Sequence, residues 1–176
     1  MNQLIKKAMK GDADAFTELM EQNMQSMYKT AWVYLKNDMD IADAIQDTIL
    51  ACYENLDTLR NPKYFKTWMT RVLINKCNDI IRKRQYFEDI EVVALEGELD
   101  QQFECCEWKE LLNSIEEKYS IVILMHYYDG LSAKEIGKVL GLNTNTVLTR
   151  LRRGRQQLRK ELEVSEYQTT ALRQVL

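Results

Sequence analysis

One proline, Pro62, stands in a chain of 176 residues that also holds only six glycines. Average proteins contain about 5% proline and about 7% glycine, and sheet proteins place both in their many tight turns. A chain this poor in both residues has few places at which it can reverse direction sharply. The sequence therefore predicts long helices and an all-α fold, and it disfavours β-sandwiches, collagen and disorder.

Apolar residues recur at helical spacing along the first half of the chain. One stripe predicts a helix over residues 16–35. Residues 37–40, Asn-Asp-Met-Asp, supply carboxylates that favour the start of a second helix, with a stripe over 41–52. Asn61 ends a loop, because the residue before a proline is pushed out of helical geometry, and a third helix follows over 64–85. We predict a compact N-terminal helical bundle.

Four further helices are predicted in the second half of the chain, over residues 107–115, 116–128, 133–140 and 144–162. Gly130 is a C-cap glycine, and Ser132 with Glu135 forms a capping box at the start of the third of these helices. That helix stops at Gly141, and Asn143 caps the last one. Two helices joined by a tight, glycine-containing turn are the signature of a helix-turn-helix.

Charge is distributed unevenly along the chain. Residues 60–84 carry eight basic residues against one acidic, residues 88–110 nine acidic against one basic, and residues 131–160 eight basic against one acidic. The whole-chain net charge of −3 argues against a nucleic-acid binder, but it averages +7, −8 and +7. We predict two small helical domains, 1–86 and 105–162, joined by a flexible acidic linker over 87–104, and leave residues 163–176 unassigned.

The sequence lacks catalytic and metal-binding constellations. Its four cysteines form no C-x-x-C pair, and His126, the only histidine, cannot complete a zinc-like set with them. His126 lies in an apolar stretch, where a packed, hydrogen-bonded histidine is favoured over a general base. No glycine-rich phosphate loop occurs. We expect a protein that is not an enzyme, with no catalytic residue, no metal, no cofactor and no small-molecule substrate.

Membrane and export signals are also missing. No apolar run approaches the roughly 18 to 20 residues that span a bilayer. The first residues lead into no apolar signal-peptide core. The sequence therefore predicts a cytoplasmic protein.

The last predicted helix has two distinct faces. Val147 and Leu151, with Leu158, are spaced for packing, whereas Asn145, Thr149, Arg152 and Gln156 point the opposite way. Amide, hydroxyl and guanidinium groups on one face suit contacts with base edges and phosphates. The alternative is an ordinary solvated surface helix.

The third predicted helix of the first half combines positive charge with an aromatic residue. Arg71, Asn75, Arg82 and Arg84 lie on or beyond the helix that carries Trp68. Unstacked bases stack on aromatic faces while basic residues follow the backbone, so this pairing suits an opened DNA strand. The alternative is that Trp68 and Phe65 are core residues, which is favoured for Phe65. One module for duplex and another for opened strands together indicate promoter recognition.

Three stretches in this order resemble the extracytoplasmic function (ECF) class of bacterial RNA polymerase sigma factors, over residues 5–162. The first, Asp40–Leu56 (DIADAIQDTILACYENL), is similar to the helix that docks on the polymerase clamp helices. The second, Phe65–Arg84, resembles the helix that melts and holds the minus-ten element, and the loop 55–63 matches the one that captures a flipped base. The third, Tyr119–Leu158, resembles the region that reads the minus-thirty-five element.

The resemblance and the residue patterns give three sets of candidate site residues. The core polymerase-binding set is Asp43, Gln46 and Asp47. The minus-ten set is Arg60, Asn61, Lys63, Trp68, Arg71, Asn75, Arg82 and Arg84. The minus-thirty-five set is Thr144, Asn145, Leu148, Thr149, Arg150, Arg152 and Arg153.

The resemblance implies an alternative-type sigma factor that binds core RNA polymerase and promoter DNA and directs promoter-specific initiation. It also implies a membrane-bound anti-sigma factor as a partner. Near the polymerase RNA path the acidic linker would mimic nucleic acid, and a solubilising tether is the equal alternative. The competing functions are a helix-turn-helix regulator that binds duplex DNA only and a structural helical interaction protein.

The chain departs from the family pattern at four places. Ser114-Ile115-Glu116 lacks the proline of a usual Leu-Pro pair. Leu148 stands where a basic residue is frequent, and Arg152 where an aromatic or histidine is frequent. Gly154 replaces a usual alanine, which weakens the helix by about 0.5–1 kcal/mol.

Overall fold

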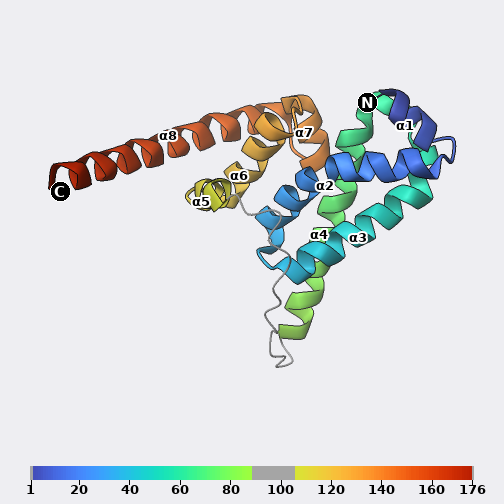
Figure 1. Cartoon of the computed structure of the whole chain (residues 1–176), viewed down its shortest axis with the longest axis horizontal. Coiled ribbons are helices and arrows are strands. Elements are labelled where there is room, and N and C mark those ends of the chain that lie inside the picture. The colour runs from blue at the N-terminus through green and yellow to red at the C-terminus, as the bar shows by residue number, and fades with distance from the viewer. Residues whose placement is uncertain (1, 89–105, 176) are drawn as a thin grey trace. The chain divides into compact units, whose positions relative to one another are not determined.

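The computed structural model describes residues 2–88 and 106–175 (Figure 1). All regular structure in these two ranges is helical, which confirms the predicted all-α fold. The chain divides into two compact units, Met1–Phe103 and Glu104–Leu176. No helix in the described ranges is long and apolar enough to cross a membrane.

The first unit is a bundle built from α1 (Asn2–Ala8), α2 (Ala13–Leu35), α3 (Asp38–Asn55) and α4 (Phe65–Glu88). Helices α2, α3 and α4 pack on one another, and α1 packs on α2. Two 3₁₀ turns, η1 (Leu56–Thr58) and η2 (Pro62–Tyr64), connect α3 to α4. The three predicted helices are confirmed. The sequence does not predict α1, because a helix that buries only Ile5 and Ala8 is too short to show a period.

Large apolar side chains from three helices form the core of the first unit. Its fully buried members are Leu19, Met27, Val33, Ile41, Phe65, Met69 and Leu73. Phe65 is therefore a core residue, as expected. Burial raises the pKa of the Cys52 and Cys77 thiols to about 12. Both thiols remain protonated and pack as small apolar groups.

The turn between α2 and α3 forms without glycine or proline. Lys36 ends α2 in the left-handed conformation, with φ of 55°, and its N–H donates to the Trp32 carbonyl at 3.3 Å. The Lys36 ammonium lies 3.5 Å from the centroid of the Trp32 ring, a cation–π contact that favours this conformation. Asn37 then caps α3 by accepting a hydrogen bond from the Asp40 N–H at 3.1 Å.

The second unit contains α5 (Cys106–Asn113), α6 (Glu117–Ile123), α7 (Ala133–Leu140) and α8 (Thr144–Val175). Helix α6 widens into a π-helical turn, η4 (Leu124–Tyr128), where the sequence predicts one continuous helix. Asp129 N–H accordingly donates to the Leu124 carbonyl, five residues back, at 3.2 Å.

Two predicted helix ends are wrong. Helix α8 continues to Val175 instead of ending near residue 162, because residues 163–175 contain no proline or glycine. Helix α4 continues to Glu88, so the linker predicted over 87–104 begins two residues too early. The remainder of that predicted linker lies outside the described residues.

The turn between α7 and α8 follows the prediction closely. Ser132 and Glu135 form the capping box, and Gly141 ends α7 with φ of 66°. The Leu142 N–H donates to the Gly137 carbonyl at 2.8 Å. A Cβ at Gly137 would lie 2.6 Å from the Leu142 carbonyl oxygen, so the backbone of this turn leaves no room for a side chain there. Asn143 caps α8 by accepting from the Thr146 N–H at 2.8 Å.

Gly154 lies where α8 packs closely on α6. A Cβ at this position would lie 2.6 Å from Ile123 Cδ1 and 3.1 Å from Tyr119 Cβ. The glycine that lowers the intrinsic stability of α8 therefore also permits the close approach of the two helices. His126, also predicted to be packed, is half-buried and its Nδ1 donates to the Leu131 carbonyl at 2.9 Å.

Candidate nucleic-acid interface

The first turns of α8 place one stripe in the core and the opposite stripe in solvent. Val147, Leu151 and Gly154 are buried against α6 and α7, whereas Leu158, predicted for the same stripe, is half-buried. The polar stripe predicted to face away is exposed at Asn145, Thr149, Arg152 and Gln156. The division of this helix into a packing face and a polar face is therefore confirmed.

All seven residues of the minus-thirty-five set lie on this one stretch of α8. Thr144, Leu148 and Arg153 are exposed beside the polar stripe, and the Leu148 side chain is an apolar group with 51% of its surface in solvent. Arg150 is half-buried on the side that faces α6. At about 100° per residue, Arg153 and Leu148 flank the stripe on opposite sides, and Arg150 lies about 130° from its centre, towards the packing face. The surface thus offers guanidinium, amide, hydroxyl and methyl groups together.

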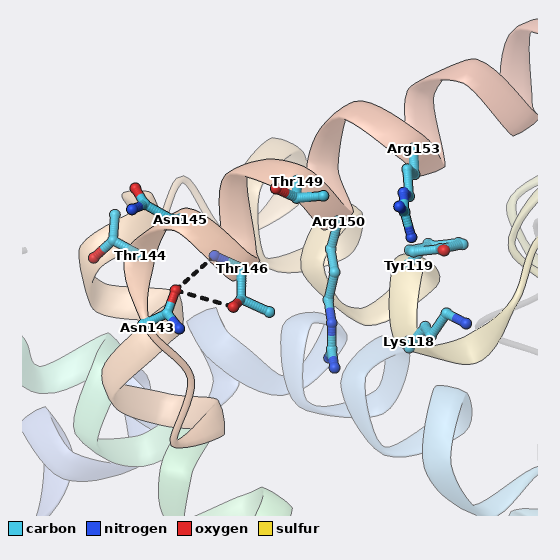
Figure 2. A pocket seen from close by; sticks show the side chains of 9 residues that line it. All are labelled: Lys118, Tyr119, Asn143, Thr144, Asn145, Thr146, Thr149, Arg150 and Arg153. Atoms are coloured by element: carbon cyan, nitrogen blue, oxygen red, sulfur yellow. Dashed lines mark hydrogen bonds between the residues drawn. The ribbon is translucent and has the colours of Figure 1, made fainter.

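An open hollow of about 630 Å³ lies along the Arg150 side of α8 (Figure 2). It is lined by Lys118, Tyr119, Asn143, Thr144, Asn145, Thr146, Thr149, Arg150 and Arg153. Figure 2 shows Arg150 and Arg153 extending from α8 towards the side of α6 that carries Lys118 and Tyr119. The sequence reasoning omits Lys118, because no spacing along the chain relates α6 to α8.

One carboxylate stands beside these cations. Glu116, just before α6, forms an ion pair with Lys118 and accepts a hydrogen bond from Gln157 Nε2 at 3.4 Å. The hydrogen bond from Lys118 is the largest cause of a lowered pKa at Glu116, with smaller contributions from Gln157 and Arg153. The same bond raises the pKa of Lys118. Both side chains are therefore charged at neutral pH.

The exposed side of α4 brings together four residues of the minus-ten set. Trp68 is half-buried, whereas Arg71, Asn75 and Arg82 are exposed. At about 100° per residue these four positions fall within a sector of roughly 60°. The Trp68 ring packs on the buried Phe65, with 6.3 Å between the ring centroids. The indole thus contacts a core side chain, while the exposed polar residues of the stripe lie on the same sector of α4.

Arg84 does not share this stripe. It lies about 160° around α4 from Trp68, and its guanidinium forms an ion pair with Asp40 of α3. The other three members of the minus-ten set belong to the segment before α4. Arg60 and Lys63 are exposed there, and Asn61 caps η2 by accepting from the Lys63 N–H at 3.0 Å.

The polymerase-binding set lies on the solvent side of α3. Asp43, Gln46 and Asp47 are all exposed, and the Asp47 carboxylate is 3.7 Å from the Lys76 ammonium of α4. The same side exposes three large apolar residues that sequence reasoning misses: Met39 at 50%, Leu50 at 57% and Tyr53 at 65%. Their spacing of eleven and three residues could have revealed them in the sequence. This spacing places all three on one face of α3, away from the stripe that packs in the core.

Two family models match the chain. One, described as Sigma-70 region 2, matches residues 19–86, and the other, described as Sigma-70, region 4, matches residues 107–158. The first match runs from within α2, through α3, to near the end of α4, and the second runs from α5 to the first half of α8. The candidate site residues all lie within these two matches.

Curated relatives match over most of the chain. The ECF RNA polymerase sigma factor SigW of Bacillus subtilis (strain 168) is 34% identical over 176 residues, which cover 90% of this chain and 94% of SigW. The RNA polymerase sigma factor SigV of the same organism is 29% identical over 141 residues, covering 78% of this chain and 85% of SigV.

Two solved structures share the fold. CnrH, in complex with the cytosolic domain of CnrY, has a TM-score of 0.64 and 24% identity, covering 93% of this chain and 97% of CnrH. The sigma factor RpoE from Bartonella quintana, in complex with the anti-sigma factor NepR, has a TM-score of 0.66 and 23% identity. The match covers 85% of this chain and 97% of RpoE.

Proposed function

Because the chain belongs to the ECF class of sigma-70 factors, alternative sigma factors that direct transcription initiation with RNA polymerase, we propose which of its surfaces performs each step. The helix-turn-helix domain, residues 105–162, reads the upstream duplex. The helical bundle, residues 1–86, docks on the polymerase and captures the melted minus-ten strand. The observation that carries this assignment is the two-faced α8, with a buried apolar stripe and an exposed polar one.

We place α8 in the major groove of the minus-thirty-five element. Asn145 and Arg152 can each form paired hydrogen bonds with a base edge, the amide with adenine and the guanidinium with guanine. Leu148, exposed on the flank, suits the methyl group of thymine. Arg150 and Arg153, on the side of the hollow, suit backbone phosphates.

We place the melted minus-ten strand against the α4 stripe and the loop before it. Trp68 offers a ring face to an unstacked base, and Arg71 and Arg82 offer charge to the backbone. Arg60 and Lys63 extend the cationic surface towards the loop. Arg84 remains in the proposed set as a phosphate contact, which it can make only by exchanging Asp40 for a phosphate.

We propose the exposed side of α3 as the surface that docks on core RNA polymerase. Asp43 and Gln46 supply hydrogen-bonding groups, and Met39 and Leu50 supply apolar area on the same side. Exposed apolar groups within a polar frame are typical of protein interfaces. A regulator that binds duplex DNA alone would have no use for this surface, so α3 favours the sigma-factor assignment over that alternative.

We further propose an anti-sigma protein as a partner. Both solved structures that share the fold hold a bound partner: RpoE was solved with the anti-sigma factor NepR, and CnrH with the cytosolic domain of CnrY. The sequence interpretation that this partner is membrane-bound remains part of the proposal. So do the cytoplasmic location and the assignment of no chemical reaction to the chain itself.

Run-off transcription tests the proposed function. Purified core polymerase plus this protein, on promoter fragments from its own genome, should yield discrete transcripts, whereas core polymerase alone should yield none. Sequencing the transcript starts would then define the promoter. Absence of any transcript across the genomic fragments would contradict the proposal. Duplex binding without polymerase binding would favour the duplex-only regulator.

A further inference from the structure

The hollow beside α8 contains a cation that belongs to none of the candidate site residues. Lys118, on α6, lines this space together with Arg150 and Arg153 of α8 (Figure 2). The volume of the hollow, about 630 Å³, falls within the range of about 300–1,000 Å³ that holds small ligands. A phosphate group with its sugar therefore fits. Thr149 adds a hydroxyl to the same wall. Ammonium, guanidinium and hydroxyl groups are the usual donors to backbone phosphates.

Lys118 is not a free cation in this structure. Glu116 forms an ion pair with it, and the Glu116 carboxylate also accepts from Gln157 Nε2 at 3.4 Å. The side chains of Lys118 and Glu116 are 49% and 53% exposed, so solvent and ligands reach the pair. The Glu116 carboxylate is therefore paired with the Lys118 ammonium. An incoming anion would have to displace this carboxylate or share the ammonium with it.

We propose that Lys118 binds a backbone phosphate of the duplex that α8 reads, and that Glu116 competes with that phosphate for Lys118. The inference rests on the proposed function, since it requires α8 to lie on duplex DNA. It adds a contact from α6 and a built-in anionic competitor. DNA binding at this point is an exchange of one anion for another, so the Lys118 contact is weaker than that of an unpaired lysine.

This exchange has a distinct signature. Each phosphate neutralised by a protein cation contributes about 0.9 to the slope of log K against log salt. A Lys118→Gln variant should therefore bind every duplex sequence less tightly and lose up to about 0.9 of the slope, because Glu116 already offsets part of the Lys118 charge. A Glu116→Gln variant should bind every duplex about two- to fivefold more tightly, the fold-change that corresponds to one surface ion pair. In Lys118→Gln the competitor has no target, so adding Glu116→Gln should change little.

The experiment uses the full chain with core polymerase. Binding is titrated over a series of salt concentrations on a duplex promoter obtained from transcript-start mapping and on a scrambled duplex. Glu117→Gln is the matched control for Glu116→Gln, because Glu117 is exposed and forms no ion pair with the described residues. Lys6→Gln, exposed on α1, is the matched control for Lys118→Gln. Thermal unfolding of each variant verifies that the second unit remains folded.

The outcomes distinguish failure of this inference from failure of the proposed function. An unchanged salt slope in Lys118→Gln, while the unaltered holoenzyme still binds its promoter, would overturn this inference alone. Equal tightening by Glu116→Gln and Glu117→Gln would also overturn it, since general charge would then account for the effect. Failure of the unaltered holoenzyme to bind any promoter duplex would overturn the proposed function and this inference with it.

Discussion

On α4 three cations are paired with carboxylates of their own unit, whereas on α8 Arg150 and Arg152 form no ion pair with any described residue. The α4 pairs are Lys76 with Asp47 at 3.7 Å, Arg82 with Asp79 at 3.5 Å, and Arg84 with Asp40. The basic segments that include these helices, residues 60–84 and 131–160, nevertheless carry the same local charge of +7. Two segments of equal charge therefore differ in how many of their cations are available to DNA.

The difference fits the two tasks we propose. Cations without carboxylate partners release the most counterions when they meet a duplex, so α8 should dominate the salt dependence of promoter binding. On α4 the paired cations contribute less net charge, and Trp68 can contribute stacking that salt hardly screens. Variants on the two helices and in the two units test this contrast.

The largest expected effect comes from removing cations on α8. Arg152→Ala with Arg153→Ala should lower promoter affinity by about 2 kcal/mol or more, because a guanidinium on a base edge contributes about 1–3 kcal/mol. The salt slope should fall by about 0.9 for each lost phosphate contact. Arg82→Ala with Arg84→Ala on α4 should change both quantities less. Titration of duplex and pre-melted promoter templates measures both pairs, and equal losses of salt slope would remove the contrast.

The next effect concerns the turn that positions α8. Gly137→Ala should destabilise the second unit by about 1–2 kcal/mol, since its Cβ would lie 2.6 Å from the Leu142 backbone oxygen and overpacking outweighs the gain in helix propensity. Calorimetry should show the second unit melting earlier.

Gly11→Ala is the matched control in the first unit. Gly11 has φ of 88° and open space around its Cβ position, so this change costs only backbone strain, about 1 kcal/mol. It should leave duplex binding by α8 intact. Loss of upstream binding in Gly11→Ala but not in Gly137→Ala would contradict the assignment of α8.

A smaller effect is expected on the polymerase side. Asp43→Ala with Gln46→Ala should weaken core polymerase binding by about 1 kcal/mol, the threshold at which truncated interface residues are counted as significant. Duplex binding by α8 should be unchanged, which is the reverse of the Arg152 and Arg153 result. Co-purification with core polymerase measures the loss, with Glu21→Ala on the exposed side of α2 as control. Unchanged co-purification would contradict the docking surface.

The smallest effect is the pH dependence of the Glu116–Lys118 pair. The pKa of Glu116 is lowered below its ordinary 4.5, chiefly by the Lys118 hydrogen bond, so its stabilising effect is complete above about pH 4.5 and is lost as pH falls through the lowered value. The raised pKa of Lys118 makes its part complete below 10.5 and lost only as pH rises further. The stability difference between the unaltered protein and Glu116→Gln should therefore be constant near neutral pH and shrink in acid.

Thermal unfolding across the acid range measures this difference. It should be small, because solvent screens the exposed pair. A stability difference that grew in acid would contradict the lowered pKa of Glu116.

Most of the fold could be predicted from the sequence because its signals are local. The capping box of Ser132 and Glu135, the cap at Asn143 and the left-handed Gly141 each act within four residues. Apolar periodicity likewise gave the packing and polar faces of α8. The end of α8 was missed because the family resemblance stops at residue 162, although no helix-breaking residue stands there.

The availability of charge could not be predicted in the same way. Arg82 and Arg84 belong to the same basic run, but they lie about 160° apart around α4, and Arg84 meets Asp40 of α3. Gly154 is a weak point by helix propensity, but Tyr119 and Ile123 approach it so closely that no side chain fits without displacement. In each case the deciding neighbour lies on another helix.

The sequence by itself determined most of the helices, the caps of α3, α7 and α8, the glycine turn and the family, because those features depend on residues within one or two helical turns or on a pattern of residue types. Only the tertiary structure decided which cations pair with a carboxylate of another helix and which form no ion pair with the described residues. Glu116 and Gln157 stand 41 residues apart and become partners only because α6 packs on α8. An ion pair depends on distances between side chains in space, and helix packing sets those distances.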